Sequence, residues 1–374
     1  MKEPRTEEDS LGSVEIPSDS LWGASTQRAI DNFPVSARRL PSPFIRSLGL
    51  IKKGAAEANG ELKLIDRKLA HAIASAADEV ALGKRNVEFP VDVFQTGSGT
   101  STNMNANEVI ARLANIELRG DANTWNPVHP NDHVNRCQSS NDVIPSAIHV
   151  AACTEISGKL IPSLEKLRRS LSAKALEFDH IVKIGRTHLM DAMPVRLGQE
   201  FAGWARQVEK GAERMGRILP ALLELALGGT AVGTGFGAHP DFAKKVCRKL
   251  SKWTGLEFEP AKNPFEALSS HGPCVEASGA LKATAGSLVR IADDIRLMAS
   301  GPRLGFAEIK LPALAPGSSI MPGKVNPVIP EMVVQVGTQV AANDLAVTLA
   351  AQGGHLELST QLPVLASNLL ESVE

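Results

Sequence analysis

The chain has 374 residues, of which 40 are basic and 41 are acidic, so its formal net charge is −1 at pH 7. A chain of this length can bury a sizeable core and divide into about two or three domains. Its near neutrality argues against binding nucleic acid or a membrane surface through an overall charge. The sequence has no apolar run of about 18 residues, so it predicts no membrane-spanning helix.

The N-terminus and the cysteines indicate the compartment. Residues 1–5 are charged and no apolar stretch follows them, which argues against a secretory signal peptide. The four cysteines lie far apart without a Cys-x-x-Cys pair, at Cys137, Cys153, Cys247 and Cys274. Free thiols in a reducing cytoplasm are therefore favoured over disulfides or a zinc site. We expect a cytoplasmic protein.

Helical periodicity dominates the chain after a turn-rich start. Residues 1 to about 40 allow only a short strand at 14–17. Beyond them an apolar ladder over 142–180 predicts one long helix, which Pro162 should kink. Similar apolar stripes predict further helices at about 43–60, 66–84, 104–118, 195–227, 274–300, 327–351 and 360–374.

Long helices with few strand signals favour an all-α fold. We expect an elongated bundle of long helices with a smaller, mostly helical N-terminal domain. Asn, Pro and His cluster over 120–137, so we place the N-terminal domain at residues 1–136 and the central bundle domain at 137–374. The chain stops inside a helical pattern at 370–374, which predicts a bundle that is truncated at its C-terminal end.

Residues 317–327 form the most polar loop of the sequence, with two glycines and two prolines that shape the backbone. Pro327 suits the first turn of a helix, which predicts a helix start here. The free N–H groups and the dipole of that helix would favour an anion beside Lys324, such as a dicarboxylate or a phosphate. The glycine spacing and Val325 after the lysine do not fit a P-loop, which excludes nucleotide binding at this loop.

Four clusters of hydroxyl and amide residues each stand just before a predicted helix. Taken singly, such residues are usually helix caps. One cluster contains His188 and another contains Lys324, so together they favour a composite anion-binding site. The clusters are residues 96–103, 139–142, 186–188 and 317–327.

Two other patterns are weaker. His129 and His133 have the spacing of helical metal ligands, but Pro130 between them argues against a helix, and no metal site is predicted. Three glycines resemble a dinucleotide-binding loop but follow a predicted helix rather than a strand, so a tight turn between helices is favoured. These glycines are Gly233, Gly235 and Gly237.

Taken together, these segments resemble the fumarase/aspartase superfamily, and the class II fumarases in particular. Residues 317–327 resemble the superfamily signature, and fumarase-like stretches occur at 97–100, 103–105, 129–132, 138–142, 185–188 and 226–235. His188 and Gly323 favour fumarases, because aspartases usually carry Gln and Ala at these two positions. Phe236, Gly237 and Ser359 depart from the usual fumarase residues.

The resemblance implies reversible hydration of fumarate to L-malate without metal or cofactor, a hydro-lyase reaction of the tricarboxylic acid cycle. It implies that Ser318 is the base that takes a proton from C3 of malate, and that His188, paired with Glu331, transfers protons to and from the water. The implied substrate-binding residues are Ser98, Gly99, Thr100, Ser139, Ser140, Asn141, Thr187, Ser319, Lys324, Val325 and Asn326. A second, non-catalytic dicarboxylate site is implied at His129, Pro130, Asn131 and Asp132.

The resemblance also implies a homotetramer in which loops from three subunits build each site. Relative to the family, the small C-terminal domain is expected to be missing. Two other functions stay open: an ammonia-lyase of the aspartase type, and a folded helical scaffold left inactive by truncation.

Overall fold

A computed structural model describes residues 3–119, 124–315 and 317–374. Helices dominate it and the strands are short, which confirms the all-α fold class. The chain divides into two compact units: unit 1 comprises residues 1–155, 219–275 and 346–374, and unit 2 comprises residues 156–218 and 276–345. No helix in the described ranges is long and apolar enough to cross a membrane.

The predicted boundary between residues 136 and 137 falls inside unit 1. There α5 (Ser140–Glu155) packs against α2 (Ser42–Glu61), and both belong to unit 1. The predicted division into domains 1–136 and 137–374 therefore stays a prediction. Residues 120–123 of the proposed boundary stretch lie outside the described residues.

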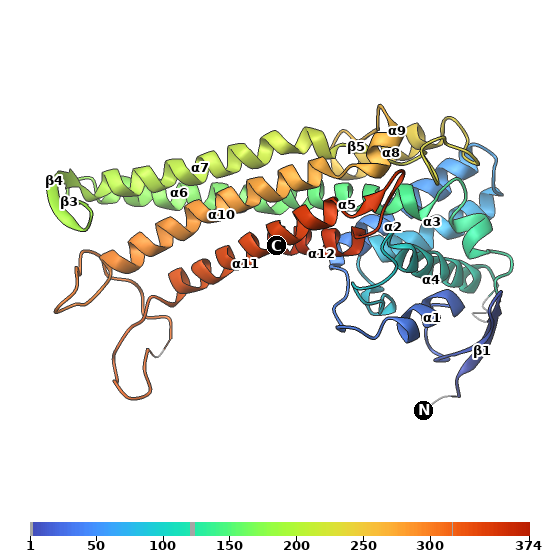
Figure 1. Cartoon of the computed structure of the whole chain (residues 1–374), viewed down its shortest axis with the longest axis horizontal. Helices are drawn as coiled ribbons and strands as arrows, with labels where there is room; N and C mark the ends of the chain where they lie inside the picture. The colour runs from blue at the N-terminus through green and yellow to red at the C-terminus, as the bar shows by residue number, and fades with distance from the viewer. Residues whose placement is uncertain (1–2, 120–123, 316) are drawn as a thin grey trace. The chain divides into compact units, whose positions relative to one another are not determined.

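Unit 1 is built around α2, which contacts α3, α5 and α8 (Figure 1). Its side chains Phe44, Leu48 and Ile51 are fully or almost fully buried and lie three to four residues apart, as one face of a helix requires. Its other helices are α1 (Ala24–Asn32), α3 (Arg67–Ala81), α4 (Thr100–Arg119), α8 (Phe242–Thr254), α9 (Pro264–Ser269) and α12 (Leu362–Val373), with short turns at Asn86–Glu88 and Pro130–Val134. Its strand pairs are β1 (Arg5–Asp9) with β2 (Gly12–Ile16), β5 (Glu224–Leu225) with β6 (Glu259–Pro260), and β7 (Gly354–His355) with β8 (Leu358–Ser359).

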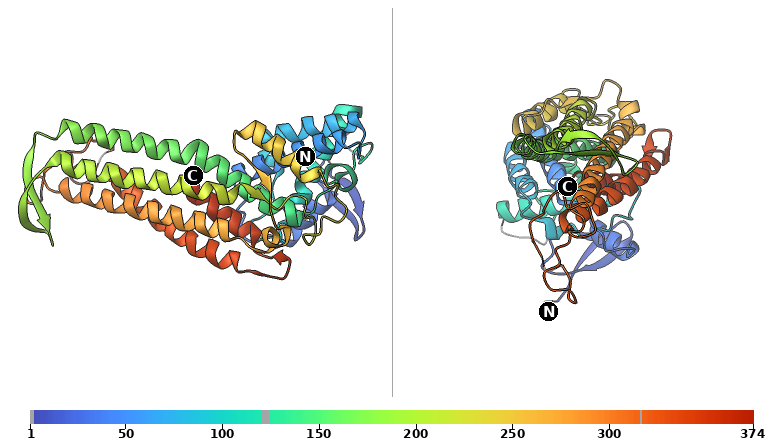
Figure 2. Two further views of the ribbon diagram at one scale, coloured as in Figure 1. Left: turned by 90° about the horizontal axis from the view of Figure 1, so that it is seen from above. Right: turned by 90° about the vertical axis from the view of Figure 1, so that its left-hand side faces the viewer.

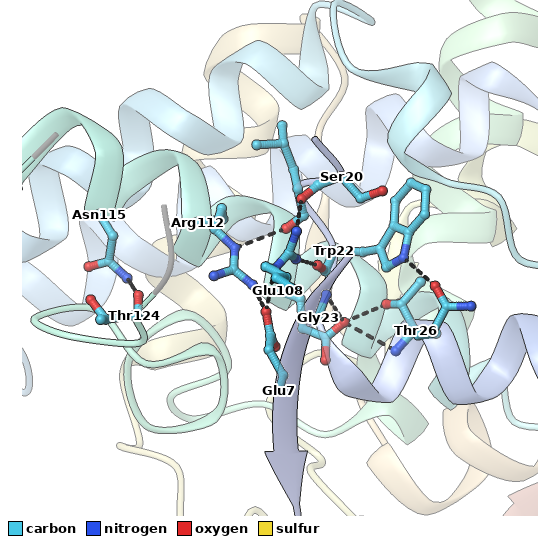
Figure 3. A network of polar contacts seen from close by, with 12 residues as sticks. Glu7, Ser20, Trp22, Gly23, Thr26, Glu108, Arg112, Asn115 and Thr124 are labelled. Atoms are coloured by element: carbon cyan, nitrogen blue, oxygen red, sulfur yellow. Dashed lines mark hydrogen bonds and ion pairs between the residues drawn. The ribbon is translucent and has the colours of Figure 1, made fainter. Parts of the chain in front are cut away.

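A buried polar network joins the N-terminal segment to α4 (Figure 3). Glu108 of α4 accepts hydrogen bonds from the backbone N–H groups of Gly23 and Ser25, both at 2.9 Å, and so caps the start of α1. Burial raises the pKa of the Glu108 carboxyl. One turn further along α4, Arg112 forms an ion pair with Glu7 of β1. Helix α1, which the sequence did not predict, therefore depends on a carboxylate far away in the chain.

Unit 2 contains long helices that lie side by side in Figures 1 and 2: α6 (Ile161–Glu177) and most of α7 (Leu197–Leu222), α10 (Gly272–Met298) and α11 (Val328–Ala351). Glycine lets two of them approach closely. A Cβ on Gly337 of α11 would lie 2.2 Å from Cγ2 of Val289 on α10, so a larger residue would push these helices apart.

The single long helix predicted over 142–180 is interrupted. It consists of α5, a π-helical turn at Ile156–Leu160, and α6. The π-helical turn places Pro162 in the first turn of α6, where its missing N–H costs little. The helix type thus changes just before the proline, and the predicted kink stays a prediction.

A two-stranded antiparallel hairpin, β3 (Val182–Thr187) with β4 (Met190–Arg196), connects α6 to α7. The expectation that residues 186–188 directly precede a helix was wrong, because Pro194 lies in β4 and α7 begins only at Leu197.

Candidate active site

The loop before α11 is closed on itself, with Ser318 near one end. The hydroxyl oxygen of Ser318 accepts hydrogen bonds from the backbone N–H groups of Ile320 at 3.2 Å and Met321 at 3.1 Å. The side-chain amide of Asn326, at the other end of the loop, donates to the carbonyl of Gly317. Two N–H donors on one hydroxyl oxygen stabilise negative charge there, which is what a serine acting as a base requires.

Glycine is needed where this loop closes. A Cβ on Gly317 would lie 1.7 Å from the carbonyl oxygen of Lys324, and Gly323 has φ +83°, a left-handed conformation that suits glycine. Lys324 and Val325 are exposed and, with Gly317, line a pocket of about 380 Å³. The helix predicted from Pro327 is confirmed as α11, which begins at Val328. Its first turn contains Glu331, and Ser319 is exposed in the loop.

His188 lies at the turn of the β3–β4 hairpin. Thr187 pairs with Met190, which leaves His188 and Leu189 as the two turn residues, with φ +55° and +63°. Two successive positive φ values match a type I′ turn, which normally uses Asn and Gly. Side chains such as His and Leu are strained in this conformation, and strain of this kind clusters at functional sites.

A pocket of about 660 Å³ is lined by His188 and Thr187 together with residues of α7 and α10. Its charged wall is a chain of ion pairs: Lys183 lies 2.8 Å from Glu200 and 2.5 Å from Glu308. Burial pushes the pKa of Glu308 upward, but hydrogen bonds from Lys183 and Arg186 outweigh it and hold the pKa below its usual range.

The predicted pairing of His188 with Glu331 is not formed within the described residues of one chain. No hydrogen bond or ion pair joins the two side chains there, and the pocket that contains His188 is not lined by Ser318. The pairing stays a prediction.

In unit 1 the structure brings two of the predicted clusters together. The side-chain amide of Asn103 on α4 donates to the Ser140 hydroxyl at the start of α5, at 3.0 Å. In the turn before α4, the hydroxyls of Ser98 and Thr100 lie 2.8 Å apart, around Gly99 with φ +75°. Helix α4 starts at Thr100 rather than near residue 104, so Thr100 and Asn103 belong to its first turn.

Asn141 and Asp142 tie the second cluster to the loop of glycines after β5. The Asn141 side chain donates to the Ala231 carbonyl at 2.8 Å. The Asp142 carboxylate accepts N–H groups from Ser139, Gly228 and Thr230 at 2.9–3.0 Å. Burial raises the pKa of Asp142 to about 7 against the effect of these donors. The three glycines of the weaker motif have φ values of +70 to +100°, which confirms a tight turn at Gly233, Gly235 and Gly237.

Lys52 is a buried cation that the sequence analysis did not single out. It is 0% exposed and donates to the side-chain oxygens of Asn135 and Gln138, both at 3.0 Å. Burial lowers the pKa of Lys52 to about 7, while Asp142 acts in the opposite direction. A lysine within an otherwise apolar helical stripe was the only signal available for it.

The second predicted dicarboxylate site is a π-helical turn capped by His129. The turn spans Pro130–Val134, so the expectation that Pro130 prevents a helix was wrong; a proline at a helix start loses no hydrogen bond. His129 Nδ1 accepts the N–H groups of Asn131 and Asp132, each at 3.3 Å. The described residues contain no group of three or more His, Cys, Asp or Glu that could hold a metal ion.

Comparison with known proteins identifies the family. The family model described as "Lyase" matches residues 12–342. Fumarate hydratase class II of Methylorubrum extorquens is 53% identical over 371 residues, covering 99% of this chain and 79% of that protein. Fumarate hydratase class II of Nitrosomonas europaea is 51% identical over 372 residues, covering 100% and 80%.

Solved structures identify the same family. The crystal structure of a class II fumarase from Schistosoma mansoni superimposes with a TM-score of 0.96 at 41% identity, over 99% of this chain and 81% of that chain. These matches give no direct support to the expectation that a C-terminal domain is missing. The family match, the sequence identity and the fold agree, and the chain belongs to the class II fumarase family of lyases.

Proposed function

We propose that this chain catalyses the reversible hydration of fumarate to L-malate. The observation that carries the proposal is the Ser318 hydroxyl oxygen, which accepts two backbone N–H groups inside the closed loop before α11. The relatives that share about half of the sequence are themselves named fumarate hydratases.

In the dehydration direction the steps follow from the charges involved. Ser318, as its alkoxide, takes the proton from C3 of malate, and the electron pair moves into the adjacent carboxylate. Lys324 and Asn326 stabilise the resulting dianionic aci-carboxylate, a charge that develops only as the reaction proceeds. His188 then donates a proton to the C2 hydroxyl. The C2–O bond breaks, water leaves, and the electron pair returns from the aci-carboxylate to form the double bond of fumarate. Glu331 orients His188 and stabilises its protonated form.

Polar groups of several loops bind the substrate in this proposal. Hydroxyl, amide and backbone N–H donors satisfy the two carboxylates of a small dicarboxylate. These residues are Ser98, Gly99, Thr100, Ser139, Ser140, Asn141, Thr187, Ser319 and Val325. The capped turn at His129–Asp132 is proposed as the second dicarboxylate site, with no catalytic role.

The active site is proposed to form in a cytoplasmic homotetramer. The unit 2 part of α11 exposes Ile329, Met332 and Val336 by 46–52%. These residues recur at intervals of three and four, which forms an apolar stripe suited to a partner helix. Packing of bundles from several subunits would supply the contact between His188 and Glu331 that one chain lacks.

Purified protein incubated with L-malate tests the proposal directly. We expect the ultraviolet absorbance of fumarate to appear. A signal with L-aspartate instead would indicate an ammonia-lyase, and no signal with either substrate from a folded protein would indicate an inactive scaffold.

A further inference from the structure

We propose that Glu308 is a positioning residue that fixes the β3–β4 hairpin and thereby orients His188. The proposal rests on the proposed hydratase function, because it assigns to Glu308 an effect on the histidine used there. Glu308 itself lies outside the residues proposed to touch substrate.

Glu308 holds the hairpin by a two-pronged contact. One carboxylate oxygen lies 2.5 Å from Lys183 Nζ and the other lies 2.5 Å from Arg186 Nη1. Both cations are on β3, and the Glu308 side chain is only 14% exposed. The Arg186 guanidinium also lies over the ring of Phe306, 4.4 Å from its centroid. Partly buried charge-assisted contacts of this geometry fix orientation better than an exposed ion pair.

Besides Glu308, two ion pairs tie the hairpin to the rest of unit 2: Lys183 with Glu200 of α7 at 2.8 Å, and Arg196 with Asp179 at 3.0 Å. A two-stranded hairpin alone is marginally stable in water. Its apolar side chains Val182, Met190 and Met193 are 70–74% exposed, so they contribute little burial within one chain. The strained turn at His188 adds a cost that surrounding contacts must offset.

Glu308 is itself fixed to the bundle. Its backbone N–H donates to the carbonyl of Met298 at the end of α10, at 2.9 Å, and the N–H of Ala307 donates to Ser300, also at 2.9 Å. The carboxylate therefore links a rigid helix end to the strand that leads into the His188 turn.

The Glu308 carboxylate also contributes to the net charge around His188. The charged groups of the hairpin and of its pocket are Lys183, Arg186, Asp191, Glu200, Arg290, Asp294 and Glu308. Without Glu308, the ion pair that Arg186 keeps among the described residues is the longer one to exposed Asp191, at 3.4 Å. Loss of the Glu308 charge changes the net charge of this set from −1 to 0, so a protonated imidazole is stabilised less and the limb of the pH profile that reports the histidine should move to lower pH.

Two variants of Glu308 distinguish the effect of its side-chain position from the effect of its charge, and a third variant is the control. Glu308→Gln removes the charge, whereas Glu308→Asp keeps it but shortens the side chain. Asp179→Asn removes the exposed carboxylate that pairs with Arg196, at the opposite end of the hairpin from the turn. Malate turnover, its pH profile and deuterium exchange of the 182–196 amides are measured for all three.

We expect Glu308→Gln to lower kcat about 10–100-fold with a smaller effect on KM, as a slight misplacement of a catalytic group does. The limb of its pH profile that reports the histidine should move to lower pH, and its hairpin amides should exchange faster. Glu308→Asp should lower kcat without moving the pH limb, and it carries the test if the Gln variant does not fold. Asp179→Asn should match the parent in all three measurements.

The proposal would be overturned if both Glu308 variants showed the same hairpin exchange and the same kcat as Asp179→Asn. Exchange is measured without substrate, so it reports on positioning even if the parent shows no hydratase activity. An inactive parent with a loosened hairpin in Glu308→Gln would reject the hydratase function and keep the positioning role of Glu308.

Discussion

The Ser318 hydroxyl is held as an acceptor, with two backbone N–H groups directed at its oxygen. A serine is a weak base unless its anion is stabilised, and these donors together with the nearby positive end of α11 provide that stabilisation. The neighbouring Lys324 is exposed and available to an anionic substrate.

Ser318→Ala is therefore expected to lower malate turnover by about 10²–10⁴-fold, the usual contribution of a general base. The side chain is half-exposed in a loop, so circular dichroism should show an unchanged helical content. Ser170→Ala is the control, because Ser170 is exposed on α6 and lies outside the proposed site. Equal turnover in the two variants would reject Ser318 as the base.

His271 makes stability depend on pH. Its ring Nε2 lies 2.8 Å from the Ser359 hydroxyl, and burial, with a smaller effect of His149, lowers the pKa of His271 to about 4. An unfolded histidine titrates near pH 6.5, so between about pH 4 and 6.5 the unfolded chain binds a proton that the folded chain does not.

Lowering the pH from about 6.5 to about 4 should consequently reduce the free energy of unfolding by about 3 kcal/mol through this group. Urea unfolding at a series of pH values measures the effect. His271→Gln keeps a polar partner for Ser359 but does not titrate, so its curve should be flatter over this range. A parent and a Gln variant with parallel curves would show that His271 does not titrate as described.

At the scale of secondary structure, long apolar stripes were enough to predict most helices, while short elements depended on distant contacts. Helix α1 was missed because its cap is Glu108, far away on α4, rather than a neighbouring residue. The β3–β4 hairpin was missed because its turn uses His188 and Leu189 where a hairpin usually shows Asn and Gly. Pro162 indicated an irregularity, but sequence could not distinguish a kink from a π-helical turn.

The packing of the α4 start against the segment before α12 can be tested at Gly97. A Cβ there would lie 1.9 Å from the carbonyl oxygen of Thr360, and the Gly97 carbonyl accepts the N–H of Leu362 at 2.9 Å. Gly97→Ala should displace the turn that carries Ser98, lower stability by about 1–3 kcal/mol and raise KM for malate.

Thermal unfolding and steady-state kinetics measure both effects. Gly272→Ala is the control, because among the described residues the nearest atom that its Cβ would meet is Ser270 Oγ, at 3.8 Å. If both alanine variants unfold at the same temperature with the same KM, the close approach at Gly97 does not constrain the site.

At the scale of the whole molecule, the sequence predicted the fold class and placed all four polar clusters just before helices, whereas the structure places residues 186–188 in a hairpin. The sequence could not show which clusters meet. The contact between Asn103 and Ser140 unites two of them in unit 1, whereas His188 and Glu331 form no bond within the described part of one chain. If these two residues meet only between subunits, as proposed, a single sequence carries no pattern that shows it.

The most direct test mixes two inactive variants, Ser318→Ala and His188→Asn, after partial denaturation and refolding together. If each site takes these two residues from different subunits, some sites in hybrid tetramers contain neither substitution. We predict that malate turnover reappears in the mixture and is absent from each variant refolded alone. Hybrid tetramers that form but stay inactive, or a parent that sediments as a monomer, would contradict a fumarate-hydrating site shared between subunits.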